Sequence, residues 1–110
     1  MTYYEISTMI KEIGLPYAYY QFPDTGQTPP FICYFYPNNN DFIADNENYV
    51  KVELLTLELY TDTKDFSLEA RVEAALKEAG LVFSRDEEYI ESERMHLTLY
   101  YMEVVINGRE

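Results

Sequence analysis

Carboxylates and hydroxyls gather in one short corner of the chain, T-D-T-K-D at residues 61–65. Asp62 and Asp65 could hold a metal ion or act as an acid and a base, because paired carboxylates serve both kinds of chemistry. Asp65, however, stands just before an apolar pattern at helical spacing, where a side-chain oxygen accepts hydrogen bonds from unpaired backbone N–H groups. We therefore interpret the corner as a turn that ends in a helix cap at Asp65, and we assign it no metal.

The single histidine and the single cysteine offer little further chemistry. His96 lies in an expected strand with no Ser or Cys near it in the sequence, which is weak evidence for a catalytic triad. Cys33 lies among apolar residues, where a thiol behaves as a small hydrophobe. We predict no enzyme and no cofactor. A small hydrolase that uses His96 with a remote carboxylate remains an alternative.

A polar segment at residues 37–48, P-N-N-N-D-F-I-A-D-N-E-N, separates two apolar stretches. It lacks the alternating acidic ladder, central glycine and closing glutamate of a calcium loop, so we predict no metal there. Long loops in small domains are often functional. We predict a mobile interaction loop, with candidate contact residues Asn38, Asn39, Asn40, Asp41, Phe42, Asp45, Asn46 and Glu47.

The charge balance excludes two classes of partner. The chain carries 20 acidic and 8 basic residues, for a formal net charge of -12. Binding to duplex DNA normally requires clustered Lys and Arg, and an anionic membrane surface repels an acidic protein. We therefore predict no direct nucleic-acid binding and no membrane partner. Repulsion of a polyanion, or a basic protein partner, remains possible.

Periodicity predicts one α+β domain over residues 1–110. A helix capped by Thr2 comes first, and a second helix runs from Asp65 to Gly80, with Glu69, Glu73, Lys77 and Glu78 expected in solvent. Apolar stretches at residues 16–22, 31–36, 49–60, 81–90 and 94–106 predict strands. The expected fold is a mainly antiparallel sheet of about five strands with two helices packed on one face, in the order α-β-β-β-α-β-β.

The third expected strand, residues 49–60, changes its apolar phase near Leu54. This change indicates either a bulge near Leu54 or a strand whose two ends bury opposite faces. At ~3.3 Å per residue the strand is long for so small a domain and could project toward a neighbouring subunit. Twelve tyrosines also suit partly buried subunit contacts.

Several stretches resemble the siphophage and prophage tail-terminator (tail-completion, head–tail joining) family of Gram-positive bacteria. They are G-L-P-Y-A-Y-Y-Q-F, P-P-F-I-C-Y-F-Y-P-N-N-N-D-F-I-A-D-N, L-E-L-Y-T-D-T-K-D-F-S-L-E-A-R-V-E-A-A-L-K-E-A-G-L and Y-Y-M-E-V-V-I. The similarity spans roughly residues 2–106 and rests on element order and a few phrases.

The resemblance implies a structural protein of the virion tail, assembled in the host bacterial cytoplasm. It implies a ring of identical subunits, commonly a hexamer, that caps the tail tube and meets the head-connector protein. An acidic lumen in such a ring would repel passing DNA. The alternative from a different class is a small ligand-binding or regulatory α+β domain of a host bacterium.

Overall fold

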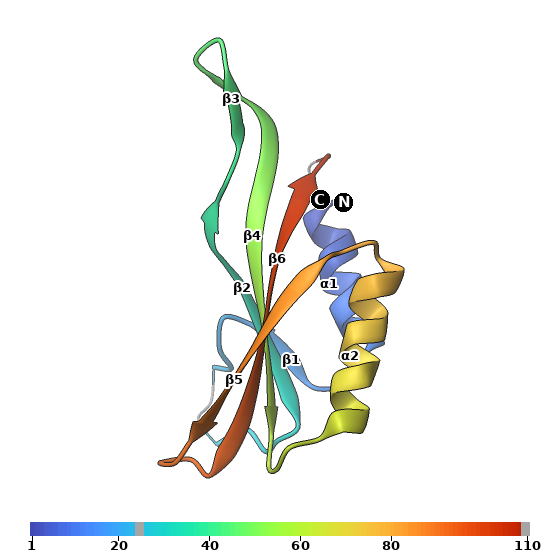
Figure 1. Ribbon diagram of the computed structural model, residues 1–110, viewed down its shortest axis with the longest axis vertical. Helices are drawn as coiled ribbons and strands as arrows, with labels where there is room; N and C mark the ends of the chain where they lie inside the picture. Colours follow the sequence, from blue (N-terminus) through green and yellow to red (C-terminus); the bar gives the residue numbers. More distant parts are fainter. Residues whose placement is uncertain (24–25, 109–110) are drawn as a thin grey trace.

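Among the described residues, two helices cover one face of a six-stranded sheet, while the other face carries no helix (Figure 1). The computed structural model describes residues 1–23 and 26–108. The helices are α1 (Tyr3–Glu12) and α2 (Phe66–Glu78). Neither of these helices is long and apolar enough to cross a bilayer. The α+β class predicted from the sequence is confirmed.

The sheet has the order β1-β2-β4-β6-β5, with β3 paired to the outer part of β4. All pairings are antiparallel except that between β1 and β2. The prediction of about five strands missed β3, which forms inside the segment expected to be irregular. The strands are β1 (Tyr17–Tyr19), β2 (Phe31–Asn39), β3 (Phe42–Ala44), β4 (Glu47–Thr61), β5 (Phe83–Ile90) and β6 (Met95–Ile106).

Both helices begin at the caps expected from the sequence. The Thr2 hydroxyl accepts a hydrogen bond from the Glu5 N–H at 3.1 Å, and the Glu5 carboxylate accepts one from the Thr2 N–H at 2.8 Å. At α2, the Asp65 carboxylate accepts a hydrogen bond from the Leu68 N–H at 2.9 Å. The predicted cap at Asp65 is therefore confirmed. Such caps satisfy donors that the first helical turn leaves unpaired.

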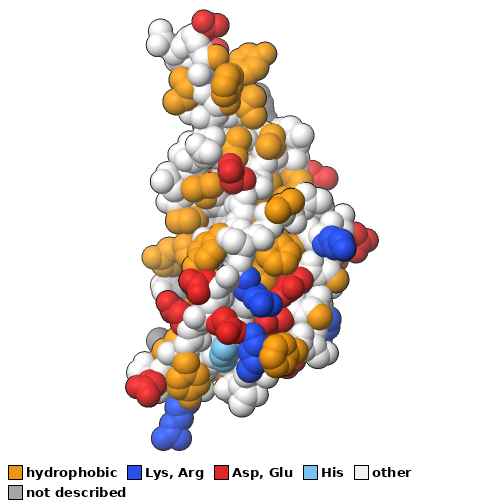
Figure 2. All heavy atoms as spheres, in the orientation of Figure 1, with side chains coloured by type: hydrophobic (Ala, Val, Ile, Leu, Met, Phe, Trp, Pro, Cys, Tyr) orange, Lys and Arg blue, Asp and Glu red, His pale blue; other side chains and the backbone are white. Residues whose placement is uncertain are grey.

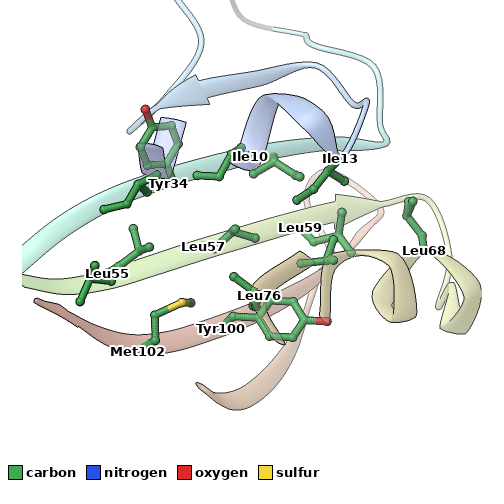
Figure 3. Packing of buried hydrophobic residues seen from close by; sticks show 14 of the residues in the cluster. Ile10, Ile13, Tyr34, Leu55, Leu57, Leu59, Leu68, Leu76, Tyr100 and Met102 are labelled. Carbon is green, nitrogen blue, oxygen red and sulfur yellow. The ribbon is translucent and has the colours of Figure 1, made fainter. Parts of the chain in front are cut away.

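The hydrophobic core lies between the helices and the sheet (Figure 3). Alternate residues of β4 point to the helices, and Leu55, Leu57 and Leu59 are all buried there. Ile6 and Ile10 of α1 pack on the same cluster. Apolar residues of the neighbouring strands and of α2 complete it: Ile32, Tyr34, Leu68, Val72, Leu76, Tyr100, Met102, Val104 and Ile106.

The apolar phase of β4 changes because its two ends bury opposite faces, which was the second of the two predicted causes. β4 pairs with β6 without interruption from Lys51 to Thr61, so β4 contains no bulge near Leu54. The bulge lies in β2, where Phe35 pairs with Thr56 but Asn38 pairs with Leu54. Its extra residue falls near Pro37, which has no N–H to donate to the sheet. The two ends of β4 therefore direct their apolar side chains to opposite faces.

β3 and the first part of β4 extend well beyond the helices as a two-stranded ribbon (Figure 1). The molecule is accordingly elongated, with dimensions of 49 × 26 × 23 Å. The predicted projection of an over-long strand is confirmed.

Candidate interaction surface

The segment predicted to be a loop forms a β-hairpin, so the prediction of a loop without strands is wrong, while its predicted mobility and contacts stay predictions. β2 continues through Asn38 and Asn39, β3 begins at Phe42, and β4 already begins at Glu47. Asp45 and Asn46 form the turn, with φ angles of 51° and 62°. Two positive φ angles match the type I′ turn that a two-residue hairpin favours, and Asp and Asn tolerate them better than most residues.

Asp41 forms hydrogen bonds at the base of this hairpin. Its carboxylate accepts hydrogen bonds from the Asn48 side-chain amide at 2.7 Å and from the Val52 N–H at 2.9 Å. These two bonds lower the pKa of Asp41 below its ordinary value, and the bond from Asn48 has the larger effect. Asn40 adds bonds from its N–H to the Val52 carbonyl at 2.8 Å and from its amide to Glu103 at 3.3 Å. Asp41 and Asn40 thus have structural roles at the point where the ribbon leaves the sheet.

Large apolar side chains gather at the outer end of the ribbon. We call residues 42–49 the hairpin tip. Within it, Phe42 is 60% exposed, Ile43 66% and Tyr49 74%. The Phe42 and Tyr49 rings meet edge to face with centroids 6.4 Å apart. Figure 2 shows hydrophobic side chains gathered at this projecting end. A two-stranded ribbon has no second layer to cover such side chains, so the tip offers a contact surface.

The tip also carries charge of one sign only. Asp45 and Glu47 are exposed, and neither forms an ion pair with any residue the structure describes. Residues 42–49 contain no Lys or Arg. Of the predicted contact residues, Phe42, Asp45, Asn46 and Glu47 thus lie on the tip, whereas the Asn38–Asp41 stretch lies at its base. Ile43 and Tyr49 were not predicted. An apolar residue pair on each side of an Asp-Asn turn is the hairpin signature that could have revealed them.

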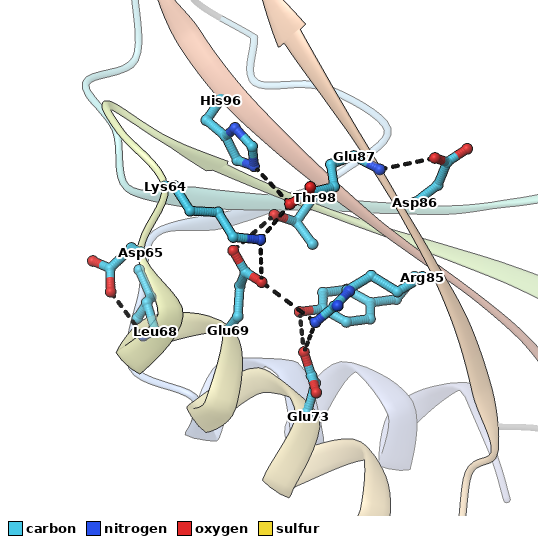
Figure 4. A network of polar contacts seen from close by, with 11 residues as sticks. Lys64, Asp65, Leu68, Glu69, Glu73, Arg85, Asp86, Glu87, His96 and Thr98 are labelled. Carbon is cyan, nitrogen blue, oxygen red and sulfur yellow. Dashed lines mark hydrogen bonds and ion pairs between the residues drawn. The ribbon is translucent and has the colours of Figure 1, made fainter.

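A second polar cluster lies under the N-terminal half of α2 (Figure 4). At its centre is Glu69, which is only 2% exposed, so the prediction that Glu69 faces solvent is wrong. Residues 69, 72 and 76 follow the i, i+3, i+7 spacing of the buried face, and this places the carboxylate against the sheet. We call this cluster the polar network. Its members are Lys64, Glu69, Glu73, Arg85, Glu87, His96, Thr98 and Tyr100.

Two cations and one hydroxyl contact Glu69 in this buried position. The Lys64 ammonium lies 2.9 Å from one Glu69 oxygen and also contacts Glu87. The Arg85 guanidinium is 3.6 Å from the same Glu69 oxygen, and the buried Thr98 hydroxyl donates to the other at 3.4 Å. A buried carboxylate is tolerated only with such partners.

Glu73 and Glu87 extend the network toward solvent. Glu73 accepts hydrogen bonds from the Tyr100 hydroxyl at 2.9 Å and from Arg85 at 3.3 Å. The bond from Lys64 lowers the pKa of Glu87. Glu73 is therefore also less solvated than predicted, whereas Lys77 and Glu78 are exposed as expected.

Glu69, Glu87 and His96 could in principle ligate a metal ion, since their donor atoms lie within 4.8 Å of one another. The Lys64 ammonium already bonds to both carboxylates, however, and so supplies the positive charge that a metal would bring. The His96 imidazole has Nε2 3.4 Å from a Glu87 oxygen. This arrangement accounts for the residue types without an ion and favours a structural role.

The remaining candidates for chemistry are dispersed. Cys33 pairs with Glu58 in the sheet register, whereas His96 pairs with Thr61, which faces the helices, so the thiol and the imidazole lie on opposite faces. Burial, with a smaller contribution from Glu58, raises the pKa of Cys33 to about 11, so the thiol stays protonated at neutral pH. Asp62 is exposed, while Asp65 caps α2. Cys33 and His96 therefore do not come together as a nucleophile–base pair.

Comparison with known proteins yields a likeness in fold. No model of a known protein family matches the chain, and no curated protein matches it by sequence. Among solved structures, the chain is similar to a chain of the virion of a native gene transfer agent (GTA) particle, with a TM-score of 0.64 and 14% identity. The match covers 93% of this chain and 86% of that one. At this identity, the likeness shows that the two chains share a fold.

Proposed function

We propose that this protein is a structural subunit of a phage-like particle and that it assembles through its projecting hairpin. The observation that carries the proposal is the hairpin tip, where Phe42, Ile43 and Tyr49 are exposed beyond the core. Exposed apolar clusters of this kind mark association surfaces in soluble proteins. The fold shared with a virion chain supports the same interpretation.

The more specific proposal is a tail terminator. In this role, identical subunits form a ring, with a hexamer as the expected size, that ends the tail tube and meets the head-connector protein. Two features support it: the resemblance of the sequence to the tail-terminator family, and an elongated subunit whose arm extends beyond its own helix layer. The strong negative charge suits a lumen through which DNA passes without binding.

The mass of the native particle, measured over a range of protein concentrations, tests this proposal. We expect a discrete ring mass that dissociates on dilution. Replacing the tip apolar residues together, as Phe42→Ser, Ile43→Ser and Tyr49→Ser, should leave the circular dichroism spectrum unchanged and the protein monomeric. The matched control is Tyr4→Ser, which removes an equally exposed aromatic from α1.

Two outcomes would contradict the proposal. Assembly of the triple variant at the wild-type concentration would show that the tip is not the contact surface. A wild-type chain that stays monomeric at every concentration, and stays separate when mixed with tail-tube and connector proteins, would favour the small ligand-binding domain instead.

A further inference from the structure

A shallow apolar groove runs between the C-terminal half of α2 and the start of β5. Ala70 and Ala74, one helical turn apart and both exposed, form its helical wall. Val82 on the other wall is 87% exposed, the largest exposed fraction among the large apolar side chains that the structure describes. We call this the α2–β5 groove. Small side chains on one wall leave room for large ones from outside.

One cation lies at this groove without a counter-ion. Lys77 lines the groove and is exposed, and it forms no ion pair with the residues that the structure describes. The carboxylate of Glu73, which also lines the groove, is occupied by Arg85 and Tyr100. The groove therefore combines an apolar surface with one unpaired positive charge.

The hairpin tip has the complementary properties. It presents three large apolar side chains and two carboxylates, Asp45 and Glu47, that lack ionic partners among the described residues. Large side chains match the alanine wall, and anions match Lys77. Complementary shape and charge are what a specific interface requires.

Other grooves match the tip less well. The groove on the opposite side of Val82 is lined by Glu103, which would repel an acidic tip. The groove between α1 and α2 contains Glu12 and Glu78, and its Arg71 already donates a hydrogen bond to the Ile13 carbonyl. Among these three grooves, only the α2–β5 groove combines an apolar wall with a cation whose side chain forms neither an ion pair nor a hydrogen bond with the described residues.

The tip cannot reach the α2–β5 groove of its own chain. The ribbon extends beyond the helix layer along the long axis of the molecule, away from α2 (Figure 1). A contact between tip and groove must then join two copies, each using a different surface. Such a head-to-tail contact closes into a ring when the rotation between copies permits.

We propose that the hairpin tip of one copy docks into the α2–β5 groove of the next copy of this chain. The inference rests on the proposed function, because it names the contact that would build the ring. Phe42, Ile43 and Tyr49 cover the alanine wall and Val82, while Asp45 and Glu47 lie near Lys77 of the neighbouring copy.

Thiol cross-linking tests the contact directly. In a Cys33→Ala background, one variant carries Ile43→Cys on the tip and a second carries Ala70→Cys in the groove. A short bis-maleimide should join a mixture of the two into dimers and no larger species, because each copy has one reactive site. A chain that carries both cysteines should give a ladder up to the ring size. The matched control replaces Ala70→Cys with Glu12→Cys in the α1–α2 groove and should give no ladder.

Charge reversal gives an independent test. Lys77→Glu should raise the concentration needed for half-assembly about tenfold, since it places like charges together. Adding Asp45→Lys and Glu47→Lys to Lys77→Glu should restore assembly.

The outcomes separate this inference from the proposed function. A ring that forms without the tip-to-groove cross-link, or with equal cross-linking at Glu12→Cys, overturns the groove and leaves the ring standing. A chain that never assembles, alone or with tail proteins, overturns both.

Discussion

The hairpin tip and the polar network both contain carboxylates, but their surroundings differ. In the polar network, Glu69 is buried and bonded to Lys64, Arg85 and Thr98. On the tip, Asp45 and Glu47 are exposed beside apolar side chains that lack a covering layer. The network carboxylates Glu69, Glu73 and Glu87 are paired with cations within one chain, whereas Asp45 and Glu47 on the tip form no ion pair with the described residues. Carboxylates alone therefore do not identify the candidate functional surface of this protein. Exposed apolar side chains beside unpaired charges do.

Removing the central carboxylate of the network should give the largest effect. Glu69→Ala deprives two cations of a partner and leaves the buried Thr98 hydroxyl without an acceptor, so we expect a loss of about 2–3 kcal/mol in the free energy of unfolding. Urea denaturation measures it. The matched control on the tip, Glu47→Ala, should change stability by less than about 0.5 kcal/mol. Equal losses of stability in Glu69→Ala and Glu47→Ala would show that carboxylates in the two regions do not differ in their structural role.

Removing the cap at the start of α2 should have the second largest effect on stability. Asp65→Ala removes the acceptor for the Leu68 N–H, which should cost about 0.5–2 kcal/mol while leaving assembly intact. Thermal and urea denaturation, with native mass, measure both properties. Asp65→Asn, which keeps a capping oxygen, is the control. Full stability combined with the loss of a metal-dependent activity would show that Asp65 is a ligand and not a cap.

Lowering the pH should destabilise both the base of the hairpin and the polar network, because each contains a carboxylate whose hydrogen bond is lost on protonation. The pKa values of Asp41 at the hairpin base and Glu87 in the network are lowered by hydrogen bonds from Asn48 and Lys64, respectively. A carboxyl group with a lowered folded-state pKa stabilises the fold above its unfolded pKa, near 4, and loses that contribution as the pH falls through the folded value.

Stability should therefore decline as the pH is lowered below about 4, measured by urea denaturation from pH 7 to pH 3. Burial raises the pKa of Glu58, so this group acts in the opposite direction and moderates the decline. Asp41→Asn should flatten the pH dependence. An unchanged slope in that variant would show that the bonds at the hairpin base contribute nothing measurable.

The tip should contribute little to stability but much to a difference between free and assembled protein. Amide exchange in residues 38–48 should be faster than in the central part of β4 in the free subunit, because the ribbon lacks a second layer. Assembly should slow it. Strong and equal protection in both states would mean that the hairpin does not form the interface.

The smallest effect that we expect concerns DNA binding. The fold brings Lys64 and Arg85 together, but each is paired with two carboxylates, so these two residues form no unpaired basic patch. A gel-shift titration of the assembled ring at low salt should detect no complex with duplex DNA. Salt-sensitive, micromolar binding would refute the proposed repulsive lumen.

Local signals in the sequence determined several elements of this protein. Thr2 and Asp65 marked the helix starts because a cap depends on residues within one helical turn. Alternation in residues 49–60 correctly indicated a long strand with two apolar phases. The count of basic residues is likewise a property of the sequence, and the expectation about DNA follows from it.

Only the tertiary structure decided the rest. Glu69 looks like an exposed helix residue until the sheet register places Thr98, Arg85 and Glu87 beneath it. The hairpin was read as a loop because its Asn and Asp residues favour turns, and its strands form only by pairing across the Asp45-Asn46 turn. Both features depend on contacts between residues that periodicity treats separately. The sequence determines which segments become helices or strands, and packing decides which charges are paired and which apolar side chains remain exposed.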